Sequence, residues 1–326
     1  MQPITIATAQ FEHKSGDKQY NLSIIEQLTA RAAADGAQVI AFHECSITGY
    51  TFSRELSREQ MLDIAEYLPE SSSVQYLQKI AARHNIAILA GLFEKDLENS
   101  LFKAYVCVDK TGLIASFRKL HPFINPHLEP GNEYVVFDLL GWKCSILICY
   151  DNNIIENVRA VSLLGADILF MPHVTMCTPS PRPGAGFVEP KLWFNRKQNP
   201  TSLRQEFDGL KGRSWLMKWL PARAYDNGLY VVFANAIGMD HDQLKNGCSM
   251  ILDPFGDILA ECRALDNDVT MALLTPEKLT QAGGFRYKQA RRPSLYAPVL
   301  TQPHTSSQKV SWLNETKETN QPGFIQ

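Results

Sequence analysis

The sequence predicts one large α/β domain, and three observations support this prediction. Strand and helix signals alternate along most of the chain. With 326 residues, 45% of them hydrophobic, the chain can bury a sizeable core. Ionisable residues directly follow several apolar strands, and open α/β sheets carry their reactive groups at such ends. We expect the domain to cover residues 1–300, with a polar arm or disordered tail over 301–326.

The first half of the chain predicts two helices packed among strands. Leu22, Ile25 and Leu28 form one apolar stripe of the first helix, which Gly36 ends. A turn signal within 109–112 predicts a hairpin. The expected elements are a strand over 3–11, a helix over 17–35, a strand over 38–42, a helix ending near 84, a strand over 86–93 and hairpin strands over 99–109 and 113–118.

The second half repeats the alternation around an insertion. Residues 175–200 are rich in proline, glycine, aromatic and basic residues, and we favour a lid-like insertion over 175–220 rather than a disordered loop. The expected elements are a strand over 144–148, a helix from 154 to 165, a strand over 167–171, a helix over 215–225 and strands over 230–235, 247–252, 257–262 and 268–274.

Composition excludes several classes of function. The formal net charge of −2 and the mixed signs along the chain give no basis for nucleic-acid binding. The N-terminus lacks the pattern of a signal peptide, and no apolar run is long enough to span a membrane. Seven cysteines, odd in number and scattered, are typical of a reduced compartment. We therefore expect a cytoplasmic protein that acts on a small molecule.

Three chemically complementary residues follow strands. Cys149 follows the apolar run 144–148, Glu44 follows the strand over 38–42, and Lys119 follows the hairpin. Each alone is more simply an inert thiol or a surface charge, but together they supply a nucleophile, a base and a cation for an oxyanion. Because a helix is expected from Ile154, we also expect its dipole to favour the Cys149 thiolate.

Metal and nucleotide sites are not predicted. Four histidines lie near strand ends, but no two have the spacing of metal ligands and no Cys-x-x-Cys accompanies them. The chain has neither glycine-rich phosphate motif. We expect no metal and no cofactor. The four histidines are His43, His121, His127 and His173.

Several motifs, in order along residues 3–298, resemble the nitrilase, or carbon-nitrogen hydrolase, superfamily. They include the residues around all three strand ends as well as later turns and strands. The matching segments are Glu44-Cys-Ser-Ile-Thr-Gly-Tyr50, Phe117-Arg-Lys-Leu-His121, Ile148-Cys-Tyr-Asp151, 226–235, 247–256 and 291–296.

The resemblance implies a four-layer α-β-β-α sandwich that pairs with a second copy. It also implies a catalytic triad of Glu44, Lys119 and Cys149. Cys149 would attack the carbon of an amide-like C–N bond while Glu44 accepts its proton, and Lys119 and the backbone N–H of Tyr150 would hold the oxyanion. Ammonia or an amine would leave, and water activated by Glu44 would cleave the thioester.

Two features depart from the family pattern or leave alternatives open. His43 stands where the family commonly has proline. For the family's second glutamate we select Glu129, although Glu133 and a solvent-exposed loop carboxylate remain alternatives.

Candidate substrate-binding residues are His173, at another strand end, and Trp193, in the insertion. For the aromatic residues, packing in the core or lid is an equally good interpretation. Aromatic side chains that could line a pocket are Trp193, Phe194, Trp215 and Trp219.

The residues after the nucleophile bear on the activity. Cys149-Tyr150-Asp151 resembles amidases and carbamoyl-hydrolysing relatives more than nitrilases, which tend to show Cys-Trp-Glu. We therefore expect an amidase-type hydrolase. The alternatives are an N-carbamoyl or ureido amidohydrolase, a nitrilase or a thioester-forming acyltransferase, and the least favoured is a protein that only binds a ligand.

Overall fold

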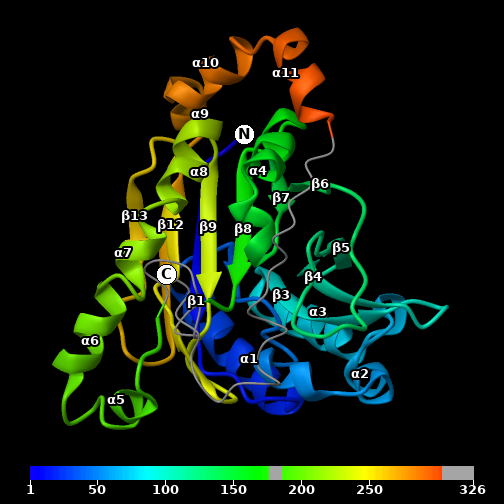
Figure 1. The fold of residues 1–326 in the computed structure, drawn as a ribbon, viewed down its shortest axis with the longest axis vertical. Coiled ribbons are helices and arrows are strands. Elements are labelled where there is room, and N and C mark those ends of the chain that lie inside the picture. Colours follow the sequence, from blue (N-terminus) through cyan, green and yellow to red (C-terminus); the bar gives the residue numbers. More distant parts are fainter. Residues whose placement is uncertain (176–185, 303–326) are drawn as a thin grey trace.

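The computed structural model describes residues 1–175 and 186–302, in which two six-stranded mixed sheets stack face to face (Figure 1). The first sheet has the order β14-β1-β2-β3-β4-β5 and the second β13-β12-β9-β8-β7-β6. The first sheet's strands are β1 (Ile4–Gln10), β2 (Val39–Ala41), β3 (Ala87–Lys95), β4 (Leu101–Asp109), β5 (Gly112–Arg118) and β14 (Asp268–Leu274). The second's are β6 (Val136–Leu139), β7 (Trp142–Ile146), β8 (Ile168–His173), β9 (Tyr230–Asn235), β12 (Met250–Leu252) and β13 (Ile258–Glu261).

The two sheets share one pattern of strand direction. In the first, β1, β2 and β3 run parallel, and the strands on either side of these three are antiparallel. In the second, β7, β8 and β9 run parallel, again between antiparallel strands. Parallel strands end at the same edge of a sheet, so residues that follow them gather there.

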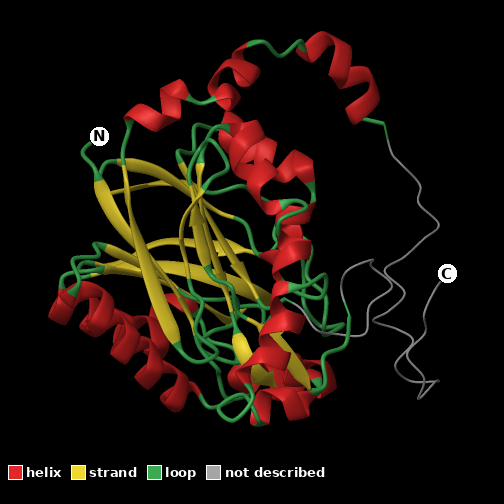
Figure 2. Ribbon diagram, turned by 90° about the vertical axis from the view of Figure 1, so that its left-hand side faces the viewer, coloured by secondary structure: helices red, strands yellow, loops and turns green. Residues whose placement is uncertain are grey.

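Helices cover the outer face of each sheet, which completes four layers (Figure 2). Helices α1 (Lys18–Ala34) and α3 (Ser72–His84) pack on the first sheet, and α4 (Ile155–Leu163) and α8 (Leu220–Asn227) on the second. Between the sheets, apolar residues of both form one core. The expected α-β-β-α sandwich is therefore confirmed.

Local signals explain the main helices. The side chain of Asp17 accepts a hydrogen bond from the Tyr20 N–H and so caps α1, while Gly36 with φ of 94° follows its end. Ser71 caps α3 in the same way, and Asn85, in the left-handed conformation, ends it. Helical packing then follows from the apolar stripes that the sequence shows.

The structure differs from the prediction in several elements, most of them in the second half. The single helix expected over 215–225 is wrong. The segment divides into α7 (Arg213–Leu216) and α8, which begins at Leu220 and has Pro221 in its first turn, where proline is tolerated. Strand β6 was not predicted. Further elements that the sequence did not suggest are the hairpin β10 (Ile237–Asp240) and β11 (Gln243–Asn246), and the helices α2 (Arg58–Ile64), α9 (Glu277–Gln281), α10 (Gly283–Gln289) and α11 (Pro293–Leu300).

The insertion has structure of its own where it is described. Residues 176–185 lie outside the described residues, but α5 (Pro190–Phe194), α6 (Pro200–Asp208) and α7 follow. Their buried side chains belong to the main core, so this part is packed onto the body. A lid role for 175–220 remains a prediction. Of the arm or tail predicted over 301–326, residues 303–326 lie outside the described residues.

Candidate active site

Two of the three predicted strand-end residues form a buried ion pair. Glu44 follows β2 and Lys119 follows β5, and they are only 1% and 0% exposed. Lys119 Nζ donates a hydrogen bond to Glu44 Oε1 at 2.7 Å. Burial opposes the charged form of both groups, but their attraction outweighs it, so the pKa of Glu44 falls to about 2 and that of Lys119 rises. Both are therefore charged at neutral pH.

A second buried lysine, which sequence reasoning missed, faces the same carboxylate. Lys103 lies within β4, and its Nζ is 3.2 Å from Glu44 Oε1. Burial and repulsion from Lys119 lower the pKa of Lys103, while Glu44 opposes this change. The other oxygen, Glu44 Oε2, is buried and has no hydrogen-bond partner among the described residues.

Cys149 lies beyond the end of β7, where the charges of this cluster reach its sulfur. Its backbone is left-handed, with φ of 51°, and the residue is partly exposed. Burial of the sulfur, followed by repulsion from Glu44, raises the pKa of the Cys149 thiol to about 11, against the opposing effects of Lys119 and Lys103. A hydrogen bond from the backbone of Val174 also favours the thiolate.

The expected thiolate stabilisation by the following helix is therefore wrong for the resting structure. A 3₁₀ turn over Cys149–Asn153 separates the nucleophile from α4, which begins at Ile155. Because the dipole effect falls off within the first turn of a helix, α4 acts weakly on the sulfur. The thiol is protonated at neutral pH, and a base has to remove its proton during reaction.

Asp151 joins the loop of the lysine to the loop of the cysteine. Its buried carboxylate accepts hydrogen bonds from the Leu120 N–H at 3.2 Å and the His121 N–H at 2.9 Å, both just after Lys119. It also accepts one from the Ile148 N–H, just before Cys149, at 3.2 Å. This carboxylate thus joins the loop after Lys119 to the loop that carries Cys149, which explains an aspartate two residues after the cysteine.

His173 ends β8 beside the same site. Its ring stacks on Trp219 with centroids 5.6 Å apart, and its Nε2 lies 3.2 Å from Asn152 Nδ2. Its charge contributes to the low pKa of Glu44. The structure therefore brings His173 to the cluster, and a role in substrate binding remains a prediction.

Two other predicted residues are not brought to the cluster. The side chain of Glu129 is exposed, and the described contact of this residue is a backbone hydrogen bond to Leu101, so the solvent-exposed interpretation fits best. Glu133 is exposed as well. The indole of Trp193 is buried, donates to Glu12 Oε1 at 3.0 Å and lies under the guanidinium of Arg196, which is a packing role. Sequence spacing alone did not determine where these loops point.

His43, which replaces the family's usual proline, begins a buried polar chain. His43 Nε2 lies 2.9 Å from His13 Nδ1, and His13 Nε2 lies 2.8 Å from Asp240 Oδ1. Asp240 in turn accepts a hydrogen bond from the Thr51 hydroxyl at 2.6 Å. The chain ties the backbone next to Glu44 to the β10–β11 hairpin and so fixes the position of the carboxylate.

A four-layer sandwich that places a thiol beside a buried carboxylate and ammonium is typical of enzymes that cleave C–N bonds through a cysteine. The model of the carbon-nitrogen hydrolase family matches residues 5–283. The chain belongs to this family and is a carbon-nitrogen hydrolase.

The chain has low sequence identity to the individual relatives that it matches. The chain is 27% identical over 272 residues to a nitrilase of Pyrococcus abyssi, covering 82% of this chain and 88% of the relative. It is 28% identical over 264 residues to a 2-oxoglutaramate amidase of Bacillus subtilis, covering 79% and 85%. A solved amidase structure from Nesterenkonia sp. AN1 has the same fold, with a TM-score of 0.67, 24% identity and coverage of 91% of this chain and 96% of the other.

Within 1–175 and 186–302, no group of three or more histidine, cysteine, aspartate or glutamate side chains is arranged to hold a metal ion. Over the same ranges, no helix has the length and apolar character needed to cross a membrane.

Proposed function

We propose that this protein hydrolyses the C–N bond of a small amide through a thioester on Cys149. The observation that carries the proposal is the buried cluster in which Glu44 keeps one oxygen without a partner beside a protonated thiol. The relatives named as amidases add support, because they share this chain's family.

The geometry favours a defined order of steps. The Cys149 proton moves to Glu44 as the sulfur attacks the carbonyl carbon, and the oxyanion is held by the Lys119 ammonium and the Tyr150 backbone N–H. The Tyr150 N–H lies in the first turn of a 3₁₀ segment, where N–H groups have no acceptor within the helix. Glu44 then gives its proton to the departing nitrogen, and the C–N bond breaks.

Deacylation reverses the proton transfer. Glu44, again a carboxylate, takes a proton from water as the water attacks the thioester carbonyl. The C–S bond breaks, Glu44 gives this proton to the Cys149 sulfur, and the carboxylic acid leaves. The same carboxylate thus serves as base in both halves, and its unpaired oxygen is available each time.

The test is turnover of a panel of simple amides, N-carbamoyl compounds and nitriles, with ammonia and acid both measured. Wild-type protein is expected to release ammonia and acid from amides, and Cys149→Ala to release neither. Turnover that survives in Cys149→Ala would contradict the proposal. Ammonia release from nitriles or N-carbamoyl compounds alone would favour the corresponding alternative, and an acyl product with an added amine would favour an acyltransferase.

We further propose that the protein pairs with a second copy. No residue of α11 is buried, and this helix projects from the body of the protein (Figure 1). Its exposed apolar side chains need a partner surface to leave water. Light scattering on the purified protein tests this, and a monomer at micromolar concentration would contradict it. The exposed apolar side chains of α11 are those of Leu295, Tyr296, Val299 and Leu300.

A further inference from the structure

Lys103 is a buried cation with no place in the steps above. Its side chain is fully buried within β4, where an unpaired ammonium would be expensive. Its Nζ lies 3.2 Å from Glu44 Oε1, so Lys103 and Lys119 converge on one oxygen of one carboxylate. The described cluster therefore contains two ammonium groups and one carboxylate.

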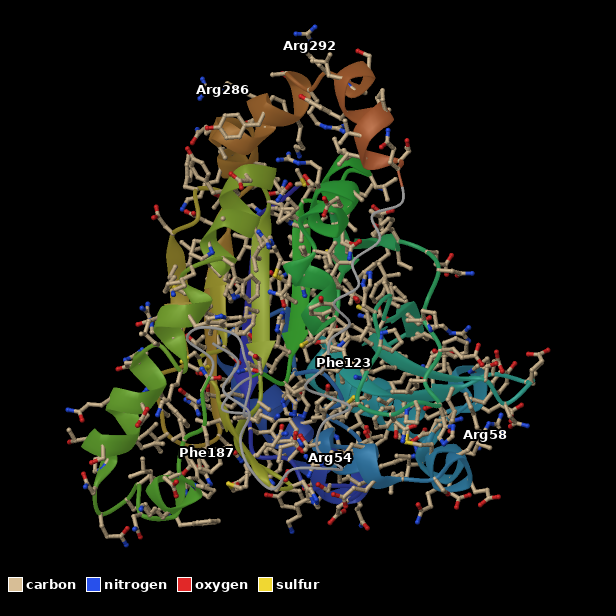
Figure 3. The ribbon with its side chains drawn as sticks, viewed as in Figure 1. Arg54, Arg58, Phe123, Phe187, Arg286 and Arg292 are labelled. Carbon is tan, nitrogen blue, oxygen red and sulfur yellow. The ribbon has the colours of Figure 1, made fainter. Side chains whose placement is uncertain are left out.

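The described contacts of the Lys103 ammonium are with groups of the protein itself. The ammonium faces Glu44 Oε1, donates to the Phe123 carbonyl at 3.4 Å, and lies 4.3 Å from the centre of the Tyr50 ring. Phe123 lies in the loop after β5 (Figure 3) and packs edge-on against Tyr150. The ammonium is buried and faces these protein groups, so Lys103 is not arranged as an anchor for a substrate carboxylate.

The arrangement instead acts on Glu44. Two ammonium groups on Oε1 leave Oε2 as the oxygen without a partner. They also counter the burial that would otherwise protonate this carboxyl group. The titratable groups facing Glu44 are Lys119 after β5, Lys103 on β4, His173 on β8, Cys149 after β7, and Cys45 and Tyr50 on its own loop.

We propose that Lys103 is a positioning residue for the hydrolysis proposed above: it keeps Glu44 ionised and holds Oε1, so that Oε2 receives the Cys149 proton. The inference rests on the proposed function. It also makes a separate statement about the ionisation of Glu44, which can be measured without any substrate.

The experiment compares wild type with Lys103→Met, which removes the charge, and Lys103→Arg, which keeps it. Lys18→Met is the control, because Lys18 also pairs with a carboxylate whose pKa is low, Glu66, but takes no part in this cluster. For each protein, the pH dependence of kcat/KM for a neutral amide is measured. So is the pH dependence of Cys149 alkylation by iodoacetamide, followed by intact mass.

Removing a cation beside a carboxylate raises its pKa, so Glu44 loses its charge at a higher pH. The acid limb of both profiles is expected to move up by about one pH unit or more in Lys103→Met. It should stay in place in Lys103→Arg and Lys18→Met. KM should change less than about threefold, because the buried Lys103 ammonium contacts protein groups rather than the substrate.

The other possible results either overturn the proposal or call for a second variant. Acid limbs of Lys103→Met that coincide with those of wild type would overturn the proposal and leave Lys103 a structural residue. A rise in KM for carboxylate-bearing amides alone would overturn it in favour of a substrate anchor. If Lys103→Met does not fold, Lys103→Gln keeps a donor without the charge and has the same expected shift. If wild type hydrolyses no amide, the proposed function fails, but the alkylation profiles, repeated in a Glu44→Gln background, still decide the role of Lys103. A shift that disappears in this background acts through Glu44, and a shift that persists is a direct effect on the thiol and overturns the proposal.

Discussion

Two cysteines occupy matching corners of the two sheets. Cys45 follows the end of β2 and Cys149 follows the end of β7, and both have a left-handed backbone with φ of 51°. Cys45 is fully buried, and burial raises the pKa of its thiol far above the ordinary value. Cys149 is partly exposed. Residue type and backbone conformation therefore do not distinguish the nucleophile, whereas access does.

The corners also differ in what holds them. Gly91 of β3 closes the first corner, because a Cβ there would lie 2.4 Å from the Cys45 backbone nitrogen. Asp151 and Val174 hold the second through hydrogen bonds, and Cys149 is partly exposed there. The first corner thus holds the Glu44 carboxylate in place, and the second holds the Cys149 thiol.

The largest expected effect comes from removing each of the two thiols in turn. Cys149→Ala should lower amide turnover by at least about 10³-fold, because the thioester cannot form. Cys45→Ala should keep turnover within about threefold of wild type. The measurement is kcat/KM for one amide in both variants at matched folding. An equal loss in the two would remove the distinction between the corners.

Asp151→Asn should have the next largest effect. An amide NH₂ in place of one carboxylate oxygen faces backbone N–H donors, so the loops of Lys119 and Cys149 separate. We expect kcat to fall about 10²-fold with a smaller change in KM. Asp138→Asn is the control, since its pair with Lys143 is exposed. Full activity of Asp151→Asn would show that the loops hold their spacing without this carboxylate.

Gly91→Ala tests the closed corner. The added methyl group has to displace the Glu44–Cys45 backbone, which should cost about 1–3 kcal/mol of stability and lower turnover about tenfold. Gly186→Ala is the control, because its methyl group would meet only the flexible side chain of Lys211. Thermal unfolding and kcat/KM measure the two effects. A loss of stability with unchanged turnover would mean that the position of Glu44 tolerates such a shift.

Glu66→Gln should have the smallest effect on turnover. Burial opposes ionisation of Glu66, but hydrogen bonds from Lys18, Ser71 and Ser73 outweigh it and hold the pKa at about 2, as in Glu44. Its folded-state pKa lies below the ordinary value of 4.5, so its stabilisation is present above pH 4.5 and is lost as the pH falls toward about 2.

The check on Glu66 is thermal unfolding from pH 7 to pH 2. The melting temperature of wild type should fall through this window, and that of Glu66→Gln should start lower and fall less. Turnover at pH 7 should stay within about twofold of wild type. A large loss of turnover would contradict the expectation that Glu66, whose carboxyl pKa is also low, takes no part in catalysis.

The sequence predicted best those site residues that directly follow a strand. Apolar runs located β2 and β7, and Glu44 and Lys119, placed at strand ends, do meet. Lys103 was not selected, because a lysine within a strand usually faces solvent, and only the stacking of the sheets shows that it points inward. Glu129 was misplaced because loop length does not determine the direction of a side chain.

The most direct test of the account is a rapid acid quench of wild-type protein mixed with an excess of a reactive amide. Ammonia and the mass of the peptide containing Cys149 are measured at each time. The account predicts that ammonia appears in step with an acyl group on Cys149, and that acid follows. Release of ammonia and acid with no acyl group on Cys149, or with the acyl group on Cys45, would contradict it.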